Sequence, residues 1–221
     1  MIKVFLVDDH ALVRNCIKAI LARDKDVKVV GEAESGESAL KGIKETQPDV
    51  VVLDILMPGL SCIDVARRLR RLYPRLKLVI LTGTNSEVFP KRFIDIGALG
   101  YVTKESGIDE VVMAIKKAYQ GQRHISAQVA QQLFLVHVED SSASLFDKLS
   151  DRELEILMMI IHGHEVEYIA DKLCLSSKTV NSHRYRIFKK LGVENDVELT
   201  HFAVKHGLID VSAPDEIKTD E

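Results

Sequence analysis

The chain has 221 residues, of which 46% are hydrophobic and 29% are charged. This composition is typical of globular proteins, excludes a predominantly disordered chain, and leaves room for two small domains. The longest apolar run is well short of the roughly 20 residues of a membrane-spanning helix, and the first residues lead directly into a strand, so we expect neither a membrane span nor a secretory signal. The net charge of −3 argues against indiscriminate binding to nucleic acid, although an average can conceal a local basic patch.

Residues 1–122 are expected to form an α/β domain, because short β-branched runs alternate with segments of helical periodicity. The predicted strands are Lys3–Val7, Val27–Gly31, Val50–Asp54, Lys77–Thr82 and Gly100–Val102. The predicted helices are Ala11–Ala22, Glu37–Glu45, Ile63–Leu72, Ser86–Ile96 and Ile108–Gln120. Such alternation predicts right-handed crossovers and a five-stranded parallel sheet with helices on both faces, which is a doubly wound, flavodoxin-like fold.

Residues 123–146 are interpreted as a linker, formed by a connecting helix over Ser126–Val138 and by the small, polar residues 139–144. From 147 to 210 the periodicity is helical throughout, which predicts a small all-α domain of four helices. These helices are Asp151–His162, Val166–Leu173, Ser177–Leu191 and Asp196–His206. The acidic residues 211–221 are expected to be a disordered tail.

Acidic side chains stand at the ends of two predicted strands. Asp8 and Asp9 follow the first strand, and Asp54 ends the third. In a doubly wound sheet, ligands bind beyond the carboxyl ends of the strands, where the winding reverses direction. If these two strands are neighbours, three carboxylates converge there, which is unfavourable unless some of them are protonated or a cation compensates them. Oxygen ligands with high negative charge favour Mg²⁺.

Two further polar residues, Thr82 and Lys104, lie at the ends of the next two strands. The Lys104 ammonium and the Thr82 hydroxyl could bind phosphate oxygens, while a metal ion leaves the Asp54 carboxylate free to attack a phosphoryl group in line. An acid at one strand end is usually a solvated side chain. The coincidence of all five residues favours a phosphorylation site.

Four motifs resemble the signatures of bacterial receiver domains: Val7-Asp8-Asp9-His10, Leu53-Asp54-Ile55-Leu56-Met57-Pro58-Gly59, Leu81-Thr82 and Gly100-Tyr101-Val102-Thr103-Lys104. The resemblance implies that a sensor histidine kinase phosphorylates Asp54. It implies that Asp9, Asp54 and the backbone carbonyl of Leu56 bind Mg²⁺ with Asp8 in support. Thr82 and Tyr101 are then expected to reorient on phosphorylation. Cys62 departs from the family, which commonly has glycine at this position.

The segment Ser177–Leu191 contains five basic residues and no acid. On a helix, its polar residues share one face, whereas Val180, Ile187, Phe188 and Leu191 share the opposite face. A short turn joins it to Val166–Leu173, which predicts a helix-turn-helix whose second helix enters the major groove. A solvated basic face is the alternative, which the capped turn and the preceding helix disfavour. The candidate DNA contacts are Lys178, Thr179, Asn181, Ser182, Tyr185, Arg186 and Lys189.

This second domain resembles the output domain of LuxR/NarL/FixJ regulators through Leu149-Ser150-Asp151-Arg152-Glu153, Ile169–Leu173 and Ser177–His183. Over its whole length the chain resembles the GacA/UvrY/LetA branch of two-component response regulators. The branch implies double-stranded DNA, a hybrid sensor kinase, a second copy of the chain and RNA polymerase as partners, and small regulatory RNA promoters as targets. On the last helix we expect Val197, Leu199 and Val204 to form the dimer contact.

Two other classes of protein share some of these features. An aspartyl-phosphate phosphatase also combines a strand-end Asp with Mg²⁺ and a lysine, but it usually carries a second acid where this chain has Leu56. We therefore expect no enzyme. A protein-interaction module that ignores DNA is disfavoured by the acid-free helix.

Several potential ligands and charged residues are expected to be structural. Cys16, Cys62 and Cys174 lack metal-like or redox-like spacing, which indicates buried free thiols in a reducing compartment and hence a cytoplasmic protein. His162-Gly163-His164 is expected to terminate a helix rather than to bind metal. The arginines at 67, 68, 70 and 71 are expected to be solvated.

Overall fold

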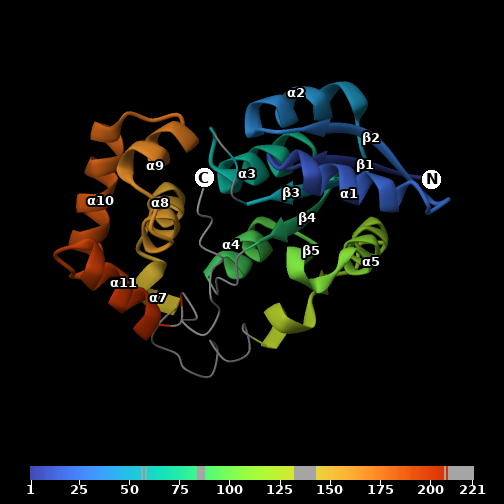
Figure 1. The fold of residues 1–221 in the computed structure, drawn as a ribbon. Coiled ribbons are helices and arrows are strands. Elements are labelled where there is room, and N and C mark those ends of the chain that lie inside the picture. Colours follow the sequence, from blue (N-terminus) through green and yellow to red (C-terminus); the bar gives the residue numbers. More distant parts are fainter. Residues whose placement is uncertain (56, 58, 84–87, 132–142, 207, 209–221) are drawn as a thin grey trace.

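An α/β domain and a helical domain make up the computed structural model, which describes residues 1–55, 57, 59–83, 88–131, 143–206 and 208 (Figure 1). The α/β domain has a parallel sheet with the strand order β2-β1-β3-β4-β5-β6. Its strands are β1 (Ile2–Val7), β2 (Val27–Ala33), β3 (Val50–Asp54), β4 (Lys77–Thr82), β5 (Gly100–Thr103) and β6 (His124–Ile125).

The first five strands confirm the predicted doubly wound sheet, with ends that differ by two residues or fewer. The sixth strand was not expected, because two residues are too few to produce a periodicity signal. It pairs with β5 through Gly100 and Tyr101. The sheet therefore extends into the segment 123–146 that the sequence had suggested to be a linker. Most of the predicted connecting helix Ser126–Val138 lies outside the described residues.

Five helices cover the two faces of the sheet: α1 (Ala11–Leu21), α2 (Gly36–Thr46), α3 (Cys62–Leu72), α4 (Val88–Ile96) and α5 (Ile108–Tyr119). Buried side chains of α1 and α5 pack against one face, and those of α2, α3 and α4 pack against the other. Every residue of β3 is buried, as expected for a strand with helices on both sides. This burial fixes β3 beside β1 and thereby positions Asp54.

The helical domain contains α7 (Ala143–Phe146), α8 (Asp151–Ile161), α9 (Val166–Lys172), α10 (Ser177–Leu191) and α11 (Asp196–Lys205). Helix α8 is buried from Glu153 to Ile161 because α10, α11 and the α/β domain all surround it. Its hydrophobic core is continuous with the core around α2, α3 and α4. The two domains thus form one packed unit. Among the described helices, none has the length and apolar character needed to cross a membrane.

Candidate phosphorylation site and DNA-binding surface

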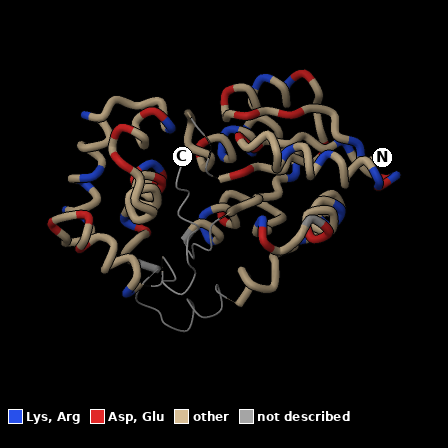
Figure 2. The backbone as a smooth tube through the Cα atoms, viewed as in Figure 1, with Lys and Arg blue, Asp and Glu red and all other residues tan. Residues whose placement is uncertain are grey.

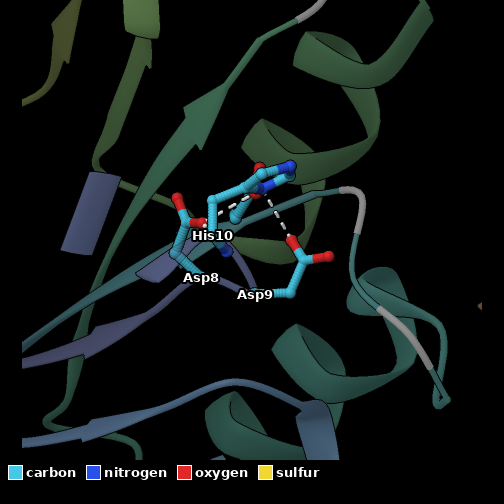
Figure 3. Close-up of side chains that lie close together, drawn as sticks. Asp8, Asp9 and His10 are labelled. Carbon is cyan, nitrogen blue, oxygen red and sulfur yellow. Dashed lines mark hydrogen bonds and ion pairs between the residues drawn. The ribbon is translucent and has the colours of Figure 1, made fainter. Parts of the chain in front are cut away.

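The acidic residues converge as their positions in the sequence predicted. Strand β1 pairs with β3, so that the ends of these two strands lie together. The potential ligand atoms of Asp8, Asp9, His10 and Asp54 all lie within 4.8 Å of one another. Figure 3 shows His10 between the two acids that precede it, with its Nδ1 atom 3.0 Å from Oδ1 of Asp9. The oxygen-rich donor set fits a hard divalent cation such as Mg²⁺.

Lys104 compensates two of these carboxylates directly. Its Nζ atom lies 2.8 Å from Oδ2 of Asp54 and 2.9 Å from Oδ2 of Asp8. Burial raises the pKa of Asp54 to about 6, although the Lys104 ammonium opposes this shift, and Asp8 adds to it. The other oxygen of Asp54 accepts a hydrogen bond of 2.8 Å from the backbone N–H of Ile55. An additional cation would therefore favour the ionised, nucleophilic form of Asp54.

Thr82 and Tyr101 lie behind the acidic cluster, and both side chains are fully buried. Their strands β4 and β5 are paired in register, with Thr82 opposite Thr103. Burial raises the pKa of Tyr101 far above its ordinary value, and the Thr82 side chain is its close polar neighbour. Both residues are placed where a change at Asp54 could reach them through the sheet. Leu56, whose carbonyl was predicted to bind Mg²⁺, lies outside the described residues.

The helix-turn-helix has the predicted division into an inner and an outer face. Val180, Ile187, Phe188 and Leu191 of α10 are buried, as are Ile169, Ala170 and Leu173 of the preceding helix. Ser176 caps α10 by accepting a hydrogen bond of 3.1 Å from the backbone N–H of Thr179. The inner face therefore confirms the prediction made from the 3.6-residue periodicity.

The outer face of α10 presents most of the candidate DNA contacts to solvent. Lys178, Ser182, Tyr185, Arg186 and Lys189 are exposed, and Tyr185 is 71% exposed. Thr179 and Asn181 are half-buried. Figure 2 shows the basic residues distributed along this helix.

Two other polar residues of α10 have roles inside the domain. Arg184 donates from Nε to Oδ1 of Asp196 over 2.7 Å, and its guanidinium group lies 5.5 Å from the ring centre of Phe188. His183 is half-buried, and burial lowers the pKa of its ring. A half-buried imidazole whose Nδ1 atom is enclosed by the protein favours a packing contact over a phosphate contact.

Comparison with known proteins agrees with both halves of this description. Residues 4–116 match the model of the response regulator receiver domain, and residues 147–203 match that of the bacterial regulatory proteins of the luxR family. Response regulator GacA of Pseudomonas protegens is 49% identical over 212 residues, which cover 96% of this chain and 100% of that protein. Response regulator UvrY of Escherichia coli K12 is 46% identical over 209 residues, which cover 94% and 96%. This chain belongs to the LuxR-type two-component response regulators.

Solved structures of a more distant response regulator share the fold. A structure of RcsB from Salmonella typhimurium is 27% identical and gives a TM-score of 0.72 over 93% of this chain and 98% of that one. A second RcsB structure, described as bound to promoter P1flhDC in the presence of phosphomimetic BeF3⁻, gives a TM-score of 0.69. The relatives are regulators with DNA-binding domains, so the protein is a transcription regulator rather than a phosphatase.

The predicted dimer contact of this response regulator requires one correction. Val197 of α11 is 66% exposed, and Val204 is half-buried, but Leu199 is fully buried. Leu199 and Ala203 are four residues apart and form the inner stripe of α11, which packs against α8. Leu199 therefore belongs to the core of the DNA-binding domain and cannot contact a second copy.

The sequence interpretation missed the contacts between the two domains. Arg67 is exposed as predicted, but it also forms an ion pair with Asp151 of α8. The carboxylate of Glu155 is buried and accepts a hydrogen bond of 3.1 Å from the backbone N–H of Cys62. Lys172 of α9 forms an ion pair with Asp9. One signal for such a contact was available in the sequence. Glu155 directly precedes a run of apolar residues, and this run indicates a buried helix.

Two of the three cysteines differ from expectation, whereas His162-Gly163-His164 follows the end of α8 as predicted. Cys62 is buried, but Cys16 and Cys174 are exposed. The Sγ atom of Cys62 lies 3.5 Å from Oε1 of Glu155, which gives this departure from the family a contact with the second domain. At the end of α8, His164 stacks on Tyr168 with ring centres 4.5 Å apart.

Proposed function

We propose that this response regulator is activated in the cytoplasm by a sensor histidine kinase, which transfers a phosphoryl group to Asp54. The observation that carries the proposal is the convergence of Asp8, Asp9 and Asp54 around Lys104 at the β1 and β3 strand ends. Asp54 supplies the attacking carboxylate oxygen, and the Lys104 ammonium pairs with a phosphoryl oxygen. The resemblance to GacA and UvrY favours a hybrid kinase as the donor.

The acidic residues would hold a magnesium ion during this transfer. Asp9 and Asp54 would be ligands, together with the Leu56 carbonyl, while Asp8 would orient bound water. When present, the ion supplies positive charge that offsets the negative charge of the phosphoryl group. Thr82 would bind a phosphoryl oxygen, and Tyr101 would change its packing in response. Both residues are buried behind Asp54, which supports such a relay.

The phosphorylated protein would bind promoter DNA as a dimer and act on RNA polymerase there. The exposed residues Lys178, Tyr185, Arg186 and Lys189 would contact DNA together with Thr179, Asn181 and Ser182. In a two-fold dimer, two α10 helices would enter successive major grooves about 34 Å apart. Val197 and Val204 remain the candidate dimer contacts on α11. Promoters of small regulatory RNAs are the targets that the resemblance favours.

Acetyl phosphate labelling tests the phosphorylation site. With Mg²⁺ present, the wild-type protein should acquire one phosphoryl group, and Asp54→Asn should acquire none. The same samples in analytical ultracentrifugation should show a dimer on a promoter fragment only when phosphorylated, and Val197→Asp should remove this dimer. Label in Asp54→Asn, or label without a divalent cation, contradicts the assignment. A phosphorylated protein that stays monomeric on DNA contradicts the dimer.

A further inference from the structure

The DNA-binding domain lies directly on the phosphorylation face of the receiver domain. Lys172, the last residue of α9, donates from Nζ to Oδ2 of Asp9. The other oxygen of Asp9 lies 3.0 Å from Nδ1 of His10. Lys104 compensates Asp8 and Asp54. In this docked arrangement every carboxylate of the cluster faces a nitrogen, and one of the two lysines comes from the DNA-binding domain.

The loop that follows Asp54 is bound by the same domain. The backbone N–H of Gly59 donates to the carbonyl of Lys172 over 3.2 Å, and the Gly59 carbonyl accepts a bond of 3.1 Å from Nη2 of Arg152. Gly59 has a φ of +88°, a conformation that favours glycine. The carboxylate of Glu155 accepts a hydrogen bond from the backbone N–H of Cys62, which is the first residue of α3 and lies three residues after Gly59. Helices α8 and α9 therefore hold both Asp9 and the β3–α3 loop.

Helix α10, the second helix of the helix-turn-helix and hence its recognition helix, takes no part in these contacts. The ion pairs and hydrogen bonds that join the domains involve α8, α9 and residues 146–149 on one side, and none of those described involves the outer face of α10. Lys178, Tyr185 and Arg186 remain exposed. Docking therefore leaves the proposed DNA surface open and covers the acidic cluster.

We infer that Lys172 is an internal competitor of Mg²⁺ for Asp9, so that metal binding and docking of the DNA-binding domain oppose each other. This inference rests on the proposal that Asp9 is a magnesium ligand. The lysine ammonium at Oδ2 of Asp9 offsets the negative charge of this carboxylate and takes up a position that a divalent cation would otherwise use. Mg²⁺ binding then displaces Lys172 and weakens the contact that α9 makes with the receiver domain.

Linkage makes the competition reciprocal. If docking weakens Mg²⁺ binding by a given factor, Mg²⁺ weakens docking by the same factor. When only a small fraction of the molecules is undocked and free to bind Mg²⁺, the apparent affinity equals the intrinsic affinity multiplied by that fraction. Lys172 and Asp9 are both partly buried, with side chains 24% and 11% exposed. For one such ion pair we expect a coupling of about five- to tenfold.

Calorimetric titration of the full chain with MgCl₂ tests the competition. Lys172→Gln removes the ammonium group and keeps the length of the side chain, so it should bind Mg²⁺ about five- to tenfold more tightly than wild type. Lys205→Gln is the matched control, because Lys205 is exposed in the same domain and forms no ion pair within the described part of the chain. Its affinity should equal that of wild type.

The outcomes separate this inference from the proposed metal site. Equal Mg²⁺ affinities for wild type and Lys172→Gln overturn the competition. Asp9→Asn is the independent check on the site itself and should lose at least tenfold in Mg²⁺ affinity. If Asp9→Asn binds Mg²⁺ like wild type, the proposed metal site fails, whatever Lys172→Gln shows.

Discussion

The face of the receiver domain that carries the acidic cluster and the outer face of α10 are both rich in charge, but only the first is in contact with the other domain. Asp9 is paired with a lysine of the DNA-binding domain, and the loop after Asp54 is bound by Arg152 and Glu155. On α10, by contrast, Lys178, Arg186 and Lys189 face solvent. The acidic cluster provides the negative charge that attracts Lys172, whereas the basic helix lacks an acidic partner among the described interdomain contacts.

This difference indicates where control of the molecule would act. A domain contact that hid the recognition helix would regulate DNA binding directly. Here the contact covers a proposed metal ligand, so the same contact would regulate phosphorylation first and DNA binding only through its consequences. Substitutions that affect one region and spare the other test this difference.

The largest effect is expected from Arg92→Ala in the covered region. The Arg92 side chain is only 12% exposed and donates to Asp151 (2.7 Å) and to the carbonyls of Phe146 (2.8 Å) and Leu149 (2.9 Å). Its removal leaves a partly buried carboxylate and two carbonyls without this donor, which should weaken docking by about 3 kcal/mol. Small-angle scattering should then show an extended molecule without Mg²⁺, and calorimetry should show tighter Mg²⁺ binding.

Arg186→Ala is the matched control on the open face. Arg186 is exposed on α10, so its loss should leave the scattering profile and the Mg²⁺ affinity unchanged while it weakens binding to DNA. If Arg92→Ala stays compact and binds Mg²⁺ as wild type does, the docked arrangement does not limit metal access.

The contrast also shows how far sequence alone can predict this protein. Asp54, Lys104 and the buried side of α10 were predictable, because strand ends and helical periodicity are local properties of the chain. The ion pair between Lys172 and Asp9 joins residues 163 positions apart in different domains. No periodicity determines which surface of one domain meets the other. The prediction of Leu199 as a dimer contact was wrong for the same reason, because the side of α11 that packs on α8 depends on the tertiary arrangement.

The second effect concerns DNA recognition by the open face. Asn181→Ala should cost about 1–3 kcal/mol on the specific operator and little on random DNA, because an amide can bind an adenine edge in two places. Lys189→Ala should instead weaken binding to all sequences and reduce the log–log salt slope by about one unit if one phosphate contact is lost. Fluorescence anisotropy at several salt concentrations measures both. Equal losses on operator and random DNA for both variants would show that the face has been misassigned.

The third effect is a pH dependence that arises in the covered region. Burial raises the pKa of Glu155 above its ordinary value of 4.5, although Ser61, Arg152 and Cys62 act in the opposite direction. The docked state thus binds this proton more tightly than an undocked or unfolded state does. The stability that Glu155 contributes is complete below pH 4.5 and is lost as the pH rises through the raised pKa.

The comparison of wild type with Glu155→Gln isolates this contribution, because Asp54 titrates in both proteins. Glutamine keeps an acceptor for the backbone N–H of Cys62 but cannot ionise. The melting temperature of Glu155→Gln relative to wild type should therefore increase from pH 5 to pH 8. A difference that stays constant over this range would contradict a raised pKa for Glu155.

The smallest effects are expected from two serines with the same local role in the two regions. Ser150 caps α8 and accepts from the backbone N–H of Glu153, and Ser176 caps α10 in the same way. Either Ser→Ala change should destabilise its helix by about 1 kcal/mol.

The consequences should differ, because α8 begins with Asp151, the partner of Arg67 and Arg92, whereas the start of α10 lies in the open region. Ser150→Ala should lower the melting temperature and tighten Mg²⁺ binding, since a frayed α8 places Asp151 less well. Ser176→Ala should lower the melting temperature to a similar extent and weaken DNA binding, but leave Mg²⁺ affinity unchanged. Identical changes in Mg²⁺ affinity for the two variants would mean that general stability, rather than the docking contact, controls access to the metal site.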